Sequence, residues 1–137
     1  MKKAIALCIL TSISLLFFAC EKKVEDDLLV TVYGYVYVDS TMTTPAQNVM
    51  VRVRTENGEY IPDAVAYTDR EGYYSVSFYL GHEYSYNDFC PFYYARVEVQ
   101  FFHEGFYYIV PDVYVEMGKS YKLPPIHLGL FTEYSGG

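Results

Sequence analysis

The chain is poor in cysteine and in basic residues, and each of these two shortages excludes a class of protein. Its 137 residues include three cysteines and no tryptophan, which is too little cysteine for a disulfide-rich scaffold. Lys and Arg number 10 against 17 Asp and Glu, and this acidic balance argues against nucleic-acid binding, because phosphate contacts need clustered basic side chains. The chain is too short for two ordinary domains, and with 52% hydrophobic residues it is too apolar to be disordered.

Tyrosine is abundant instead. The chain has 17 tyrosines and 9 phenylalanines, and every tyrosine lies after Cys20. A tyrosine offers a large contact area with a polar tip and loses little entropy on binding, so tyrosines are enriched at recognition surfaces. The tyrosine excess therefore lies in the part of the chain after Cys20, and it favours a binding surface there.

The first residues are typical of an export signal. Lys2 and Lys3 precede an uncharged, apolar stretch over residues 4–19. This stretch is shorter than the roughly 20 apolar residues that a membrane-spanning helix needs, and it ends at the small residue Ala19. We therefore expect residues 1–19 to be a signal peptide.

The segment that ends this stretch carries a resemblance. Leu16-Phe17-Phe18-Ala19-Cys20, with a Leu four residues before the cysteine and an Ala directly before it, resembles the bacterial lipoprotein box. The resemblance implies cleavage before Cys20 and lipidation of that cysteine (diacylglycerol on the thiol and an acyl chain such as palmitate on the new amine). Several acyl chains would anchor the protein to a membrane far more firmly than one. The alternatives are an ordinary secretory signal or an uncleaved anchor, and either also places the protein outside the cytoplasm.

The residues after the cysteine are charged and predict a solvated tether over residues 20–28. Loss of Lys2 and Lys3 leaves 8 basic against 17 acidic residues, a charge of about −9, so the acyl chains and not the charge would hold the protein at an anionic membrane. The acids over residues 25–27 resemble the surface-export signal of lipoproteins from Bacteroidota. We expect an outer-membrane lipoprotein on either the cell surface or the periplasmic face.

From residue 28 onward, apolar and other residues alternate with a period of two, which is the pattern of half-buried β-strands. The pattern predicts an all-β fold: a single antiparallel β-sandwich of seven to eight strands over residues 29–130, followed by a C-terminal tail at 131–137. The expected strands cover residues 30–38, 48–55, 64–68, 73–80, 95–101, 106–110, 113–117 and 120–128. The residues expected to face the core are Val30, Val32, Val36, Val38, Val49, Val51, Val53, Tyr74, Val76, Phe78, Leu80, Ala95, Val97, Val99 and Phe101.

Short turn motifs separate these strands. Asn57-Gly58 predicts a hairpin with a type I′ turn, and the returning segment should stop near Pro62, which cannot donate to a strand ladder. Residues 69–72 predict a turn, because Asp69 can accept bonds from the following backbone and Gly72 tolerates positive φ. Glu104-Gly105 predicts another turn.

Three segments occur in an order that resembles a known family. They are Gly34 to Val36, Pro45 to Val51 and Thr68 to Val76. Together they are similar to the G-x-V, P-x-x-x-V-x-V and T-D-x-x-G-x-Y pattern of the carboxypeptidase regulatory-like domain, a transthyretin-like (prealbumin-like) β-sandwich of secreted bacterial proteins. The resemblance covers residues 34–78 and implies a mostly non-catalytic binding or structural module; a loop over residues 82–91 replaces the family's closing hairpin.

Catalytic and metal-binding patterns are scarce. Cys90 would be the single free thiol of the mature chain, and it is expected to be a small buried hydrophobe rather than a nucleophile beside His82 or His103. The three histidines show no metal-ligand spacing, and Asp69 and Glu71 lack the calcium-ligand ladder. We expect no cofactor and no metal, and no enzyme activity.

The tyrosines supply the candidate binding surface. Tyr33, Tyr35 and Tyr37, here called the tyrosine stripe, share the outward face of one strand. Either they stack against a ligand or they stabilise the sheet through cross-strand pairs. Loop residues are the other candidates, because sandwiches often bind through loops at one end. These loop candidates are Tyr84, Tyr86 and Tyr93.

These observations predict a non-catalytic envelope lipoprotein that binds a protein or a glycan. The first alternative is a structural subunit of a surface assembly, in which an open sheet edge pairs with another chain. The strand from Leu28 to Val38 is the expected edge. A less favoured alternative is a small enzyme or metal protein that uses Cys90 and His82.

Overall fold

The computed structural model describes residues 29–80 and 94–134. Predictions for the remaining residues lie outside the described part. They concern the signal peptide, Cys20, the tether over residues 20–28, His82, Cys90, Tyr84, Tyr86 and Tyr93. Within residues 29–80 and 94–134, no helix is long and apolar enough to cross a membrane.

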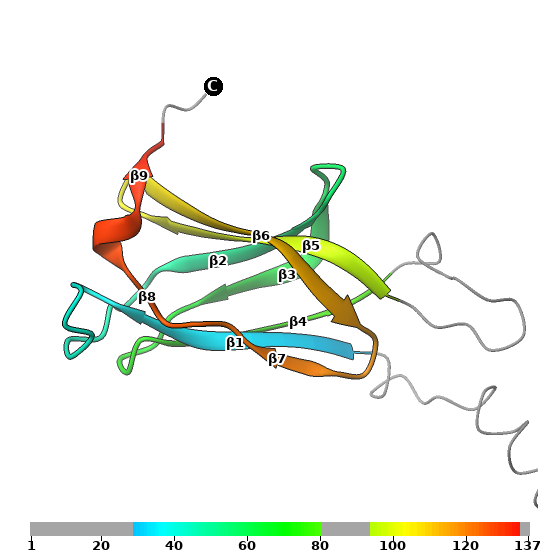
Figure 1. The fold of residues 1–137 in the computed structure, drawn as a ribbon, viewed down its shortest axis with the longest axis horizontal. Helices are drawn as coiled ribbons and strands as arrows, with labels where there is room; N and C mark the ends of the chain where they lie inside the picture. Colours follow the sequence, from blue (N-terminus) through cyan, green and yellow to red (C-terminus); the bar gives the residue numbers. More distant parts are fainter. Residues whose placement is uncertain (1–28, 81–93, 135–137) are drawn as a thin grey trace, which may run out of the picture.

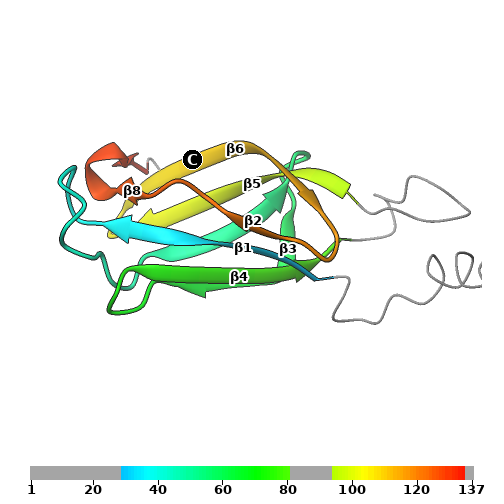
Figure 2. The same ribbon diagram turned by 60° about the horizontal axis from the view of Figure 1, so that its bottom comes forward.

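The described residues form two packed β-sheets, which confirms the predicted all-β sandwich (Figures 1 and 2). The four-stranded sheet contains β1 (Leu29–Tyr37), β4 (Tyr73–Tyr79), β7 (Ser120–Lys122) and β8 (Ile126–His127). The five-stranded sheet has the order β3 (Tyr60–Tyr67), β2 (Met50–Thr55), β5 (Tyr94–His103), β6 (Phe106–Glu116) and β9 (Thr132–Glu133). A 3-10 turn, η3 (Leu128–Leu130), joins β8 to β9. The prediction of seven to eight strands missed β9, and it divided β6 into two strands at residues 106–110 and 113–117.

The sandwich is not purely antiparallel. β7 and β8 both pair with β1 in the parallel direction. The single strand predicted over residues 120–128 is split into these two pieces, because Pro124 and Pro125 lie between them and cannot donate backbone hydrogen bonds. The C-terminal part of the chain therefore pairs with β1 over two short stretches, β7 and β8.

Alternating residues of the strands form the core, as the sequence predicted. The valines of β1 and β2 are fully buried, at 0% exposure for Val30, Val32, Val36, Val51 and Val53. Tyr74, Val76, Phe78, Ala95, Val97, Val99 and Phe101 are buried as well. Val38 is the exception: it lies past the end of β1 and is 42% exposed, so its prediction as a core residue is wrong.

One of the predicted turns differs in type from the expectation, and the turn at Glu104-Gly105, predicted without a type, is confirmed. At Asn57-Gly58 only Gly58 has positive φ, and the Gly58 amide donates to the Thr55 carbonyl, which gives a three-residue loop rather than a type I′ turn. At Glu104-Gly105 both residues have positive φ, and His103 pairs with Phe106, so the two-residue type I′ geometry is found there. The Asp69 turn is confirmed, because its Oδ1 accepts bonds from the amides of Glu71 and Tyr73.

Two strands continue through proline: one passes the predicted stop near Pro62, and the other joins the segments predicted as separate strands at residues 106–110 and 113–117. β3 runs through Pro62 and β6 through Pro111, and each proline is followed by an aspartate with positive φ, Asp63 and Asp112. The pairing register shifts beside each of these Pro-Asp steps. The proline is tolerated because a bulge removes the residue from the regular ladder.

The position of β1 in its sheet also differs from the prediction. β1 pairs with β4 on one side and with β7 and β8 on the other, so it is the centre of the four-stranded sheet and not an open edge. The paired strands on both sides form hydrogen bonds with the backbone N–H and C=O groups of β1. At the C-terminal end, β9 pairs with β6 and Phe131 is buried, so the described sheet extends past residue 130 into the predicted tail.

Candidate functional site

The tyrosine stripe lies on the outer face of the four-stranded sheet, opposite the buried valines of β1. Its three side chains are half-buried. Tyr73 of β4 joins them: its ring centroid is 5.4 Å from that of Tyr35 and 6.4 Å from that of Tyr33. The rings of Tyr35 and Tyr37 lie 6.4 Å apart and nearly parallel.

These contacts explain much of the stripe through packing. Tyr35 stands directly opposite Tyr73 in the antiparallel pair, where aromatic side chains stabilise a sheet through cross-strand contact. Further along the same face, the hydroxyl groups of Thr31 and Ser77 share a hydrogen bond of 2.8 Å. The stripe is thus a closely interlocked surface, and binding of a ligand to it stays a prediction.

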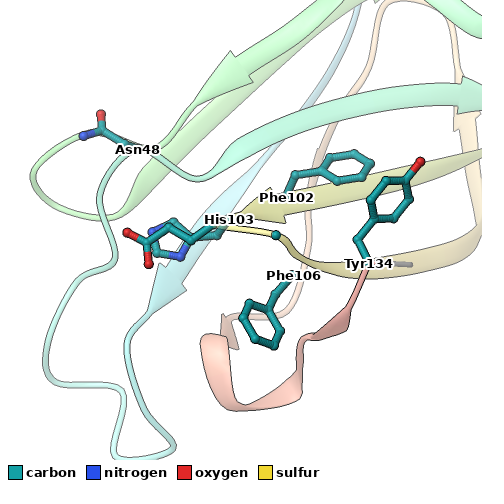
Figure 3. Close-up of a pocket in the computed structure, with 7 residues that line it drawn as sticks. Asn48, Phe102, His103, Phe106 and Tyr134 are labelled. Carbon is teal, nitrogen blue, oxygen red and sulfur yellow. The ribbon is translucent and has the colours of Figure 1, made fainter. Parts of the chain in front are cut away.

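A pocket of about 350 Å³ lies at the other sheet, around the turn between β5 and β6. We call it the turn pocket (Figure 3). Its lining residues are Asn48, Phe102, His103, Glu104, Gly105, Phe106 and Tyr134. The volume is at the lower end of the range for ligand sites.

Aromatic contacts hold one wall of the turn pocket. The ring of Tyr134 meets that of Phe102 edge-on, with centroids 6.0 Å apart, and that of Tyr107 in the same way at 5.7 Å. The amide of Tyr134 also donates to the carbonyl of Gly105 over 2.8 Å. Figure 3 shows Phe102 and Tyr134 side by side. This wall is therefore fixed before any ligand arrives.

The opposite side of the turn pocket is exposed as well. Phe106 is 47% exposed, which is unusual for a large apolar side chain. A Cβ added at Gly105 would have no atom within 4 Å, so there is open space beside the turn. Apolar surface is thus available to a ligand at this point.

Asn48, two residues before β2, also lines the turn pocket. Its backbone has positive φ, and its backbone N–H donates to the carbonyl of Thr68 over 3.0 Å. The buried hydroxyl of Thr68 also bonds with the backbone on both sides of this position, accepting from Val49 and donating to Ala46. The backbone of Asn48 is therefore held in place at the rim of the pocket, and its side chain is exposed.

The polar side chains around the turn pocket can form hydrogen bonds with a ligand. The Asn48 amide both donates and accepts hydrogen bonds, the Glu104 carboxylate accepts them, and the His103 imidazole adds a polar edge. Among the lining residues there is no Ser, Thr, Cys or Lys to act as a nucleophile. Among residues 29–80 and 94–134, no three His, Cys, Asp or Glu side chains come close enough to hold a metal ion.

A polar cluster lies further along the outer face of the five-stranded sheet. Arg54 forms an ion pair with Glu98, and the hydrogen bond to Glu98 raises the pKa of Arg54. Gln100 donates to Glu98 over 3.0 Å and accepts from the Tyr60 hydroxyl over 2.8 Å. Gln100 lies on the outer face of β5, but this network covers it and leaves it 3% exposed.

The residues of the turn pocket were not singled out from the sequence. His103 appeared only as an unfavoured partner of Cys90, and Phe106 and Tyr134 carried no motif. The available signal was the pair Phe101-Phe102, in which alternation buries one ring and turns the next one outward. No signal linked Asn48 and Tyr134 to that strand, because they are far apart in the sequence.

The comparisons with known proteins give no assignment. No family model matches the chain, and no curated protein matches it. The turn pocket and the tyrosine stripe are therefore interpreted from their own geometry.

Proposed function

We propose that the protein is a lipid-anchored, non-catalytic module of a bacterial envelope that binds a neutral glycan. The observation that carries the proposal is the turn pocket, which combines exposed aromatic rings with an amide and a carboxylate in a small concave site. Such a pocket takes a small ligand or the end of a longer chain, and it is too small to enclose a folded protein.

The donor set favours a sugar over other small ligands. A sugar ring has apolar C–H faces that pack on aromatic rings, and it has neighbouring hydroxyl groups that bond planar side chains such as Asn48 and Glu104. A negatively charged ligand would be repelled by the carboxylate of Glu104 and by the net negative charge of the protein. A neutral glycan therefore fits the pocket best.

The N-terminal sequence supports the proposed location. The apolar stretch over residues 4–19 and the lipoprotein-like segment ending at Cys20 favour an outer-membrane lipoprotein, on the periplasmic or the surface face. A charged tether of a few residues would hold the sandwich close to the membrane. A glycan of the envelope would then be within reach.

A binding comparison tests the function. The full chain is applied to an array of neutral oligosaccharides made of hexose and N-acetylhexosamine units, beside the variants Phe106→Ala and Tyr134→Ala. Tyr114→Ala is the matched control, because Tyr114 is similarly exposed (44%) on the same sheet and does not line the pocket. We expect at least a tenfold loss of signal for both pocket variants and no loss for the control.

Two outcomes would contradict this function. One is an array with no signal for the unmodified chain. The other is a signal that the pocket variants leave intact while the combined change Tyr33→Ser, Tyr35→Ser and Tyr37→Ser removes it, which would move binding to the tyrosine stripe.

The anchor is tested separately. Cells that express the chain are labelled with a radioactive fatty-acid precursor, and the same is done for Cys20→Ala. Lipidation predicts that the label disappears from the variant. Incorporation that is unchanged in Cys20→Ala would show that Cys20 carries no lipid.

A further inference from the structure

β4 forms an open edge of the four-stranded sheet. It pairs with β1 on one side and with no other strand of the described residues. The amide of Val36 donates to the carbonyl of Gly72, so by alternation Tyr74, Val76 and Phe78 direct their backbone groups toward β1. The backbone groups of Ser75 and Ser77 consequently point away from the sheet.

Two long strands at or near an edge of the five-stranded sheet are protected against pairing, and β4 is not. β3 is an edge strand with the Pro62-Asp63 bulge, and β6, covered only by the two residues of β9, has the bulge at Pro111-Asp112. Proline, bulges and charges are devices that keep sheet edges from joining other chains. β4 is a regular strand of seven residues with none of these devices.

The sequence of β4 is nearly the same in both directions around its centre. It reads Tyr-Tyr-Ser-Val-Ser-Phe-Tyr from residue 73 to residue 79, with Val76 in the middle. In an antiparallel pair of two copies centred on Val76, Ser75 faces Ser77, Tyr74 faces Phe78 and Tyr73 faces Tyr79. Each position would meet a residue of its own kind, and no like charges would meet.

We propose that two copies of this protein join through their β4 strands. The two copies are related by a two-fold axis at Val76, and the four-stranded sheets become one continuous sheet across the contact. The two-fold symmetry makes the contact closed, so it yields a dimer and not a fibre. This inference is independent of the proposed ligand.

The backbone geometry agrees with this register. In an antiparallel pair, the residues that exchange both backbone hydrogen bonds are those whose N–H and C=O groups point at the partner. Ser75 and Ser77 are the residues that point outward from β4, and the register places each of them opposite the other. A shift by one residue would instead oppose outward and inward groups and lose these bonds. The register with matching side chains is therefore also the one that forms backbone bonds.

Disulfide cross-linking tests the register in the full chain. In a Cys90→Ser background, one tagged copy carries Ser75→Cys and a differently tagged copy carries Ser77→Cys. Cα atoms of opposed residues lie about 5.5 Å apart, within disulfide range, whereas two copies of residue 75 lie diagonally at about 7–8 Å. We expect a cross-linked dimer when the two variants are co-expressed, and at least fivefold less when either is expressed alone.

Two results would overturn the proposal. The first is the absence of a dimer band from co-expressed chains under oxidising conditions. The second is a band of equal strength in all three samples, which would indicate collisions rather than a defined register.

Charge variants test the same contact without a new covalent bond. Ser75→Glu with Ser77→Glu places carboxylates opposite each other, whereas Ser75→Lys with Ser77→Glu places opposite charges together. Both positions are exposed, so both variants should fold. By sedimentation of the full chain in detergent, the first variant should dissociate at least tenfold more readily than the second. Equal dissociation of both variants, or an unmodified chain that is a monomer throughout, would contradict the dimer.

Discussion

The tyrosine stripe and the turn pocket are both aromatic surfaces, but the pocket leaves more of its rings exposed. The stripe tyrosines are half-buried and contact each other and Tyr73 across two strands. At the turn pocket, Phe106 and Tyr134 expose about half of their surface, at 47% and 53%. An aromatic side chain that packs against neighbours stabilises the sheet, whereas one left exposed beside polar groups is free to meet a ligand. The abundance of tyrosine in a sequence therefore does not locate a site, whereas exposed rings that line a pocket together with polar groups do.

The largest effect that separates the two regions is expected at two glycines with positive φ. Gly72 lies at the start of β4 beside the stripe, and a Cβ added there would overlap the carbonyl oxygen of Val36. Gly105, in the turn pocket, has the same backbone conformation with open space around it. Gly72→Ala should lower the free energy of unfolding by about 3–5 kcal/mol and Gly105→Ala by about 1–2 kcal/mol, as measured by urea unfolding. Equal losses would show that the stripe's sheet is no more tightly packed than the turn.

The pH dependence of stability sharpens the same contrast. Burial raises the pKa of Tyr74, which packs beneath the stripe with its ring 5.2 Å from that of Phe101. The unfolded chain then loses the Tyr74 proton at a lower pH than the folded chain does. The stabilising contribution is complete below about pH 10 and is lost as the pH rises above it, at about 1.4 kcal/mol per pH unit for one proton.

Urea unfolding between pH 9 and pH 11 measures this loss. Tyr74→Phe keeps the ring and removes the ionising hydroxyl, so its stability should fall less steeply than that of the unmodified chain. Parallel curves for the two proteins would mean that Tyr74 is not the buried group responsible.

A smaller effect is expected from the contacts within the stripe. Tyr35→Ala and Tyr73→Ala should be coupled by about 0.5–1.5 kcal/mol in a double-mutant cycle, because their rings are in contact. Phe106→Ala at the turn pocket should change stability by no more than about 0.5 kcal/mol, because the side chain is exposed. A coupling of zero at the stripe would leave its tyrosines without a structural role and strengthen their prediction as a ligand surface.

Features set by local sequence could be predicted, and features set by non-local pairing could not. The alternation of valines placed Val30, Val51 and Val99 in the core, and the Asp69 turn followed from side-chain chemistry. The central position of β1 depends on strands that arrive much later in the chain, at β7 and β8. An alternating pattern says which face of a strand is buried, but not which strands lie at its sides.

The candidate site was missed for the same reason. Asn48, Phe106 and Tyr134 line one pocket because the strands next to them, β2, β6 and β9, belong to one sheet. The tyrosine stripe was visible because its residues are close in the sequence. Likewise, the bulge after Pro62 lets β3 continue where the proline predicted an end.

The most direct test of the binding site is a map of backbone amide shifts in the full chain. The probe is the neutral oligosaccharide that gives the strongest array signal, added in steps to isotope-labelled protein. The account predicts shift changes concentrated at Asn48, at residues 102–106 and at Tyr134, with residues 33–37 unchanged. Shift changes at residues 33–37 with an unchanged turn pocket would contradict it.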